Sequence, residues 1–123
     1  MRKPAKLIVA MSATAAVLGA LTLSTHAVAA DEKAMIAEGK KIVEDRKKGN
    51  CLACHQIEGA ELPGNIGPPL VGMKARFPDK AKLHSQIWDS TRNNPNSIMP
   101  PFGRNEILTE DEINKVVEYI YSL

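Results

Sequence analysis

Two cysteines and a histidine stand close together in the segment Cys51-Leu52-Ala53-Cys54-His55. On a helical turn, two thiols separated by two residues lie on one face. This spacing, with histidine directly after the second cysteine, is the pattern that attaches a c-type haem. The thiols would add across the two vinyl groups of one porphyrin, and His55 would give the iron its proximal nitrogen ligand. The segment therefore predicts one covalently bound haem c.

Three other interpretations of the cysteines have less support. A disulfide between Cys51 and Cys54 would close a very short loop and would stabilise the fold little. A thioredoxin-like redox pair is expected near a βαβ pattern, and the sequence holds no strand pattern of useful length. A structural zinc site takes four ligands. Beyond residue 30 the only sulfur and imidazole candidates, methionines aside, are Cys51, Cys54, His55 and His84. A zinc site of sulfur and imidazole ligands would therefore need every one of them.

An electron-transfer haem iron takes a second axial ligand, and the candidate is Met99. Thioether sulfur raises the reduction potential of the iron, and the two prolines that follow would stiffen the loop that presents it. The competing candidates are Met73, Met35 and His84. Met73 is the serious rival, whereas His84 is expected to be an exposed surface residue.

The first 30 residues predict a secretory signal peptide. A positively charged start precedes an apolar run over residues 7–23 and a small-residue cleavage site. The run is short and diluted by Ala, Ser and Thr, which argues against a retained membrane anchor. Arg2 and Lys3 are not a twin-arginine pair, which favours the general secretory route. We expect cleavage after Ala29 or Ala30, a periplasmic location, and no membrane attachment once the signal is removed.

Residues 31–123 are expected to form one domain with a modest core. They carry 13 basic and 14 acidic residues, so the net charge of +2 for the whole chain comes from the predicted signal peptide. A domain close to neutrality gives no argument for binding nucleic acid or an anionic membrane. A bound haem would supply much of the apolar surface that so short a domain lacks.

Helices and proline-rich loops are the elements expected to position these residues. Residues 31–48 show the periodicity of an amphipathic helix. Gly39 in its interior costs about 1 kcal/mol relative to Ala, which a close contact with another helix would justify. Thr109 begins a capping box and a last helix that continues to the C-terminus. A third helix is expected to open at Asp79, or at the proline before it, and to stop before Pro95.

Residues 31–123 resemble a class I cytochrome c along nearly their whole length. The resemblance rests on the N-terminal helix, the Cys-X-X-Cys-His segment, the Gly-Pro-X-Leu segment, the Met-Pro loop and the C-terminal helix. It implies an all-α fold in which the first and last helices cross and loops wrap the haem.

The same resemblance implies roles for single residues. Pro68 would accept, through its backbone carbonyl, the hydrogen bond of the proximal imidazole of His55. Arg76 falls where an arginine lies near a haem propionate, Met99 falls on the axial methionine, and Met73 falls on an apolar core position. Trp88 could pack on the haem or belong to the ordinary core.

Five segments narrow the resemblance to SoxX, the small cytochrome subunit of the periplasmic thiosulfate-oxidising complex. They are Gly59 to Leu70, Ala75 to Asp79, Ile87 to Asp89, Asn94-Pro95 and Met99 to Gly103. The resemblance implies a non-catalytic electron-transfer subunit of an L-cysteine S-thiosulfotransferase. Its partner would be a SoxA-like subunit with one or two haems, which carries the catalytic haem, and a further cytochrome would accept the electrons.

Two other functions remain as alternatives. The protein could be a free soluble electron shuttle in the periplasm, outside any enzyme complex. It could instead be a catalytic haem protein in its own right, but this requires an open iron position, which a ligating Met99 would close.

Overall fold

The computed structural model describes residues 18–123, with side chains from residue 29 onward. The first 17 residues of the predicted signal peptide therefore lie outside the described residues. The chain divides into two compact units, residues 1–30 and residues 31–123. Within the described part, no helix combines the length and the apolar character that a membrane span requires.

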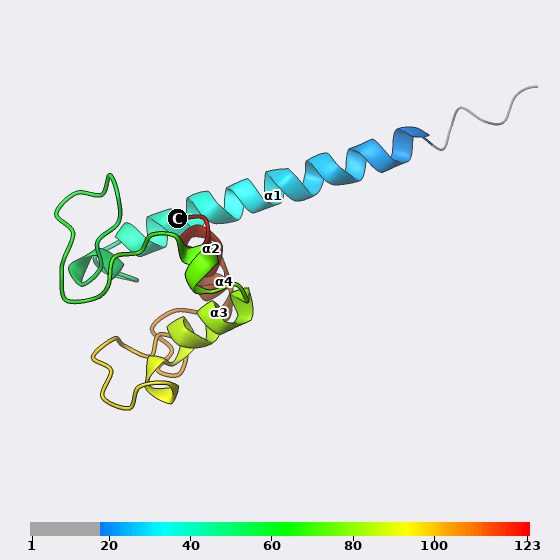
Figure 1. Ribbon diagram of the computed structural model, residues 1–123. Helices are drawn as coiled ribbons and strands as arrows, with labels where there is room; N and C mark the ends of the chain where they lie inside the picture. The colour runs from blue at the N-terminus through cyan, green and yellow to red at the C-terminus, as the bar shows by residue number, and fades with distance from the viewer. Residues whose placement is uncertain (1–17) are drawn as a thin grey trace, which may run out of the picture. The chain divides into compact units, whose positions relative to one another are not determined.

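The described chain is helical, with no strand between residues 18 and 123 (Figure 1). Its elements are α1 (Leu18–Glu44), η1 (Cys51–Ala53), α2 (Met73–Arg76), α3 (Lys80–Trp88), η2 (Ser90–Arg92) and α4 (Glu110–Tyr121), where η marks a short 3-10 helix. The prediction of an all-α fold is confirmed.

Helices α1 and α4 touch at Gly39. A Cβ atom at this position would lie 2.0 Å from the backbone oxygen of Lys115 and 3.0 Å from Cβ of Tyr119. The ammonium of Lys115 reaches back across the contact to the Glu38 carboxylate at 2.7 Å. The glycine expected to allow a close helix contact therefore lies directly against the backbone of the last helix.

The first helix ends four residues before the predicted Lys48, and its start at Leu18 precedes the predicted residue 31. The reason for the early end is Asp45. Its carboxylate accepts a hydrogen bond from the backbone N–H of Lys47 at 2.8 Å, and its carbonyl accepts from Asn50. Aspartate side chains compete in this way with the helical hydrogen bonds of the backbone. The resulting turn delivers the chain to the cysteine segment.

Helix α4 begins as predicted. The Thr109 hydroxyl accepts from the backbone N–H of Glu112, and the Glu112 carboxylate accepts from the backbone N–H of Thr109, which completes the capping box. Glu112 also accepts a hydrogen bond from the Lys48 ammonium. This bond joins the start of α4 to the turn that follows α1.

Helix α3 opens at Asp79, whose carboxylate accepts from the backbone N–H of Ala81 at 2.9 Å, and it packs against α4. Neither α2 nor η2 follows from the sequence pattern. The short α2 begins after Gly72, which has a left-handed φ of 61°. The hydrophobic core gathers side chains from every helix between residues 31 and 123 except the short η1 and η2. Its buried members are Val43, Ile57, Met73, Leu83, Ile87, Phe102, Leu108, Ile113, Val116, Val117, Tyr119 and Ile120.

Candidate haem-binding site

A cavity of about 740 Å³ opens among the loops and brings together Cys51, Cys54, His55 and Met99. Its walls are mainly apolar and come from η1, α2, α3, α4 and the loops between helices. The apolar lining residues include Ile66, Leu70, Met73, Phe77, Leu83, Ile87, Ile98, Phe102, Ile107, Leu108, Val116 and Ile120. Pockets of about 300–1,000 Å³ with apolar walls and few polar groups are typical of sites for cofactors.

The two cysteines lie on the η1 turn and are free, half-buried thiols. The backbone N–H groups of Cys54 and His55 both donate to the carbonyl of Cys51, at 3.2 and 2.9 Å, which closes the turn. Burial raises the pKa of the Cys51 thiol to about 11. This thiol is therefore protonated at neutral pH, unlike the low-pKa thiolate that a thioredoxin-like redox pair requires.

The imidazole of His55 is oriented by the backbone of Pro68. Its Nδ1 atom lies 2.7 Å from the Pro68 carbonyl oxygen. Because a carbonyl can only accept a hydrogen bond, Nδ1 must carry the proton, which leaves Nε2 with a free lone pair. A hydrogen bond of this kind fixes the ring orientation and makes the imidazole a stronger metal ligand. This is the contact that the family resemblance implies.

The loop before Pro68 packs directly on the cysteine segment. The backbone N–H of Gly64 donates to Leu52 at 2.7 Å, and that of Gly67 donates to Cys54 at 2.8 Å. A Cβ atom on Gly67 would lie 2.6 Å from Cε1 of His55. The absence of a side chain at residue 67 therefore lets the loop backbone form a cradle for the imidazole.

Met99 lies half-buried on the cavity wall, in the loop between η2 and α4. Figure 1 shows this loop, in yellow, well separated from the η1 turn that carries the cysteines. Met73 also lines the cavity and is 2% exposed, as expected of a core side chain. Neither Met35 nor His84 lines the cavity. The geometry thus places two methionines on this cavity wall and leaves the other two rivals outside it.

Arg76 lines the cavity, and its guanidinium is held by the protein. The Nη1 atom donates to the Pro69 carbonyl at 2.7 Å and lies 3.4 Å from the Met73 sulfur. These contacts place a positive charge beside the loop that orients His55. The role of Arg76 toward a haem propionate stays a prediction.

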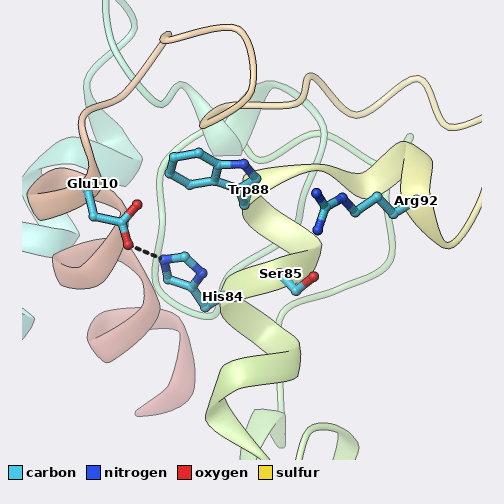
Figure 2. A pocket seen from close by; sticks show the side chains of 5 residues that line it. All are labelled: His84, Ser85, Trp88, Arg92 and Glu110. Carbon is cyan, nitrogen blue, oxygen red and sulfur yellow. Dashed lines mark hydrogen bonds and ion pairs between the residues drawn. The ribbon is translucent and has the colours of Figure 1, made fainter.

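A second, shallow pocket of about 280 Å³ lies between α3 and the start of α4, and Trp88 is one of its walls (Figure 2). The His84 ring stacks on Trp88 with centroids 6.0 Å apart, and its Nε2 atom donates to the Glu110 carboxylate at 3.0 Å. The Ser85 hydroxyl points away from the imidazole, so these side chains do not form a nucleophile–base pair (Figure 2). Trp88 does not line the large cavity. It packs instead against Gly103, where a Cβ would lie 2.1 Å from the indole.

The donor set in the large cavity fits haem and does not fit a bare metal ion. Within residues 29–123, whose side chains the structure describes, no three His, Cys, Asp or Glu side chains gather in a way that could hold a metal ion. Two thiols and an oriented imidazole in one short segment, with a thioether on the same apolar cavity, are instead the groups that haem c requires. The zinc interpretation therefore has no support in the described residues.

Ser90, the most deeply buried polar side chain beside this site, does not follow from the sequence pattern. Its hydroxyl donates to the backbone carbonyl of Met99 at 2.8 Å. A single buried serine has no periodicity that a sequence would show. The local signal is Asp89 directly before it, because aspartate commonly caps a short helical turn.

Comparison with known proteins agrees with this geometry. The family model described as Cytochrome c matches residues 36–123. A solved structure, the crystal structure of SoxXA from P. pantotrophus, matches with a TM-score of 0.63 and 28% identity, and the match covers 70% of this chain and 79% of that one. An uncharacterized lipoprotein of Aquifex aeolicus (strain VF5) is 37% identical over 76 residues. That match covers 61% of this chain but only 37% of the relative's length.

The family match, the helical fold and the cavity lead to one conclusion about the cofactor and the class of protein. The cofactor is a covalently bound haem c, and the fold is that of the class I cytochromes c. The chain belongs to the cytochrome c family and is an electron-transfer cytochrome similar to SoxX.

Proposed function

We propose that this cytochrome is the electron-transfer subunit of a SoxAX-like complex that oxidises thiosulfate in the periplasm. The observation that carries the proposal is the joint presence of His55 and Met99 on the cavity that holds the two thiols. If these two residues fill both axial positions, the iron would have no place for a substrate. Such a site is suited to one-electron transfer rather than to catalysis.

Bound haem c supplies a reversible one-electron couple. Cys51 and Cys54 would hold the porphyrin through thioether bonds, so the cofactor would not be lost during turnover. His55, kept in the correct tautomer by Pro68, would bind the iron through Nε2. Met99 would bind it through a soft sulfur, which raises the reduction potential. The apolar walls would limit the access of water to the bound haem, so little reorganisation would accompany electron transfer.

The proposed partner is a SoxA-like subunit that carries the catalytic haem, with a downstream cytochrome as the electron acceptor. The solved structure that this chain resembles is that of SoxXA. Two exposed apolar side chains, Ile66 at 64% and Ile98 at 78%, lie on the cavity lining. Exposed apolar groups at the mouth of a site are a common feature of protein–protein contacts. The loop from residue 56 to residue 70 would then form part of the interface.

Export is the remaining part of the proposal. Residues 1–30 act as a signal peptide and are removed, which leaves residues 31–123 in the periplasm. The division of the chain into units at residue 30 is compatible with this cleavage. Haem attachment then takes place outside the cytoplasm.

Co-expression with a SoxA-type subunit tests the proposal. We expect a stable heterodimer on co-purification. We also expect thiosulfate-dependent reduction of an added cytochrome when a carrier protein, on whose cysteine the SoxAX-like complex would place the thiosulfate, is present. The matched control is the Cys51→Ala/Cys54→Ala chain, which lacks the thiols for haem attachment and should not support electron transfer. If the subunits never co-purify and omission of this chain leaves the rate unchanged, the complex fails as an explanation. The free-shuttle function then takes its place.

A further inference from the structure

Asp89 and Ser90 are the two buried polar residues of the described core, at 4% and 0% exposure. Neither lines the haem cavity. Burying polar groups is costly unless their hydrogen bonds are satisfied. The hydrogen-bond partners of Asp89 and Ser90 therefore indicate which part of the molecule these two buried residues hold in place.

Both residues bind the loop that carries Met99. The Ser90 hydroxyl donates to the Met99 carbonyl at 2.8 Å. Further along the same loop, Arg104 donates from Nη1 to the Asp89 carboxylate at 3.0 Å. The backbone N–H groups of Gly103 and Arg104 donate to the carbonyl of Trp88 at 3.1 and 3.3 Å. Residues 88–90 thus hold the loop at Met99 and again at residues 103 and 104.

The Ser90 hydroxyl is itself fixed in place. Asp89 accepts hydrogen bonds from the backbone N–H of Thr91 at 3.1 Å and from its hydroxyl at 2.5 Å, which caps the η2 turn that contains Ser90. These bonds, the one from the Thr91 hydroxyl foremost, hold the pKa of the Asp89 carboxyl below its ordinary value. Asp89 therefore stays ionised, and the turn stays formed, at neutral pH.

Residues 98–100, the segment around Met99, form few other hydrogen bonds. Ile98 is 78% exposed, and Pro100 is also exposed. The backbone N–H of Met99 is bound only locally, to the Ser97 hydroxyl two residues away, at 3.2 Å. The bond from Ser90 is therefore the side-chain hydrogen bond that ties Met99 itself to the buried part of the molecule.

We propose that Ser90 is a positioning residue that keeps the Met99 thioether on the haem iron, with Asp89 holding Ser90 in place. The inference rests on the proposed assignment of Met99 as an axial ligand. A thioether is a neutral and weakly basic ligand, so a modest free energy decides whether it stays bound or yields to a competitor. The rigid attachment of its backbone supplies part of that free energy, because a pre-positioned group loses little freedom on binding.

Displacement of Met99 by added imidazole tests the proposal in the holoprotein. The parent is compared with Ser90→Ala, with Ser90→Thr, which keeps a hydroxyl, and with Ile113→Val. Ile113 is fully buried but does not line the cavity, so this last variant loses stability without removing a hydrogen bond to the Met99 loop. We expect Ser90→Ala to bind imidazole about tenfold more tightly, which corresponds to ~1.4 kcal/mol. Ser90→Thr should stay nearer to the parent, and Ile113→Val should match the parent.

The result that overturns the proposal is an imidazole affinity of Ser90→Ala equal to that of Ile113→Val, because Ser90 then acts only on overall stability. Should Ser90→Ala not yield a folded holoprotein, Arg104→Gln takes its place. This variant removes the exposed arginine from Asp89 and should tighten imidazole binding two- to threefold, and an unchanged affinity would equally overturn the proposal.

A parallel measurement on Met99→Ala separates this inference from the ligand assignment. If Met99→Ala loses the sulfur-to-iron charge-transfer band while Ser90→Ala binds imidazole like the parent, only the positioning role is wrong. If Met99→Ala keeps the band, the axial assignment is wrong and the inference falls with it.

Discussion

At the scale of single residues, the site depends on backbone atoms as much as on the side chains that name it. The proton of His55 is placed by the Pro68 carbonyl at 2.7 Å. The backbone of Gly67 passes so close to the imidazole that only glycine fits. The sequence shows which cysteines and which histidine form the site, but it does not show which backbone atoms orient them.

Gly67→Ala tests this cradle. The added Cβ would lie 2.6 Å from Cε1 of His55, so the imidazole or the loop must move and the bond to Pro68 must lengthen. A weaker bond makes His55 a poorer electron donor to the iron. We expect a higher reduction potential in a protein that still carries covalent haem, measured by redox titration.

The matched control is Gly64→Ala. Its Cβ would lie 2.2 Å from the Ala53 backbone oxygen, and none of its three nearest atoms belongs to His55. This variant should lose stability while keeping the parent potential. Equal potentials in Gly67→Ala and the parent would show that the loop does not tune the iron.

At the scale of secondary structure, two contacts join the region of the first helix to the last helix. Their contact at Gly39 is so close that a Cβ atom on this residue would lie 2.0 Å from a backbone oxygen of α4. A second link joins Lys48, in the turn after α1, to Glu112 in the first turn of α4. Both links lie on the path from the first helix to the cysteine segment.

Gly39→Val should destabilise the fold by about 1–3 kcal/mol through steric overlap with α4. The control is Ala37→Val, an exposed position on the same helix, which carries the helix-propensity cost of valine without the overlap. Thermal or denaturant unfolding of the holoproteins gives the comparison. The visible spectrum of folded Gly39→Val should equal that of the parent, and equal stability of the two variants would show that Gly39 is merely tolerated.

Glu112→Gln probes the second link through pH. The hydrogen bond from Lys48 is the main cause that holds the pKa of Glu112 below its ordinary value. Because the pKa is lowered in the folded state, the stabilisation is present above the unfolded pKa of about 4.3 and is lost as the pH falls through the folded value. Glutamine can still cap the helix. We expect the variant to be less stable by about 0.5–1 kcal/mol at pH 7, with the difference disappearing in acid.

Unfolding of the parent and Glu112→Gln at a series of pH values measures this difference, and exposed Glu58→Gln serves as the control. If the difference in stability between the parent and Glu112→Gln stays constant from pH 7 to acid, the ionised carboxylate is not its cause.

The elements that the sequence predicts well are those with strong local signals. The capping box at Thr109 and the cap at Asp79 mark the starts of α4 and α3 where the structure has them. The end of α1 at Glu44 depends on a competing side chain at Asp45, and a four-residue helix such as α2 is too short to show periodicity. The role of Ser90 cannot be predicted for a further reason. Its hydroxyl binds the Met99 carbonyl nine residues away, and only the folded chain brings these two groups together.

At the scale of the whole molecule, the domain over residues 31–123 is built around a cavity as well as around a hydrophobic core. Side chains of α3 and α4 serve both the hydrophobic core and the cavity wall, Leu83, Ile87 and Val116 among them. The bound haem c would complete the packing of these walls and would thereby couple folding to cofactor attachment. This coupling cannot be predicted from helix patterns, because the apolar faces look the same whether they meet each other or a porphyrin.

Processing of the whole chain is a separate prediction. The basic, apolar and small-residue segments at the start should direct export and cleavage. N-terminal sequencing of the exported holoprotein should begin at Asp31, or at Ala30 if cleavage follows Ala29. A membrane-bound product that begins at Met1 would show that the segment is a retained anchor.

The red end of the visible spectrum of the oxidised holoprotein tests the central claim, that His55 and Met99 are the two axial ligands of the haem iron, most directly. The parent should show the weak band of sulfur-to-iron charge transfer. Met99→Ala should lose the band and have a lower reduction potential. Met73→Ala should keep the band while losing roughly 2–5 kcal/mol of stability as a core truncation. The opposite pattern, with the band lost in Met73→Ala and kept in Met99→Ala, would contradict the account and move the axial ligand to Met73.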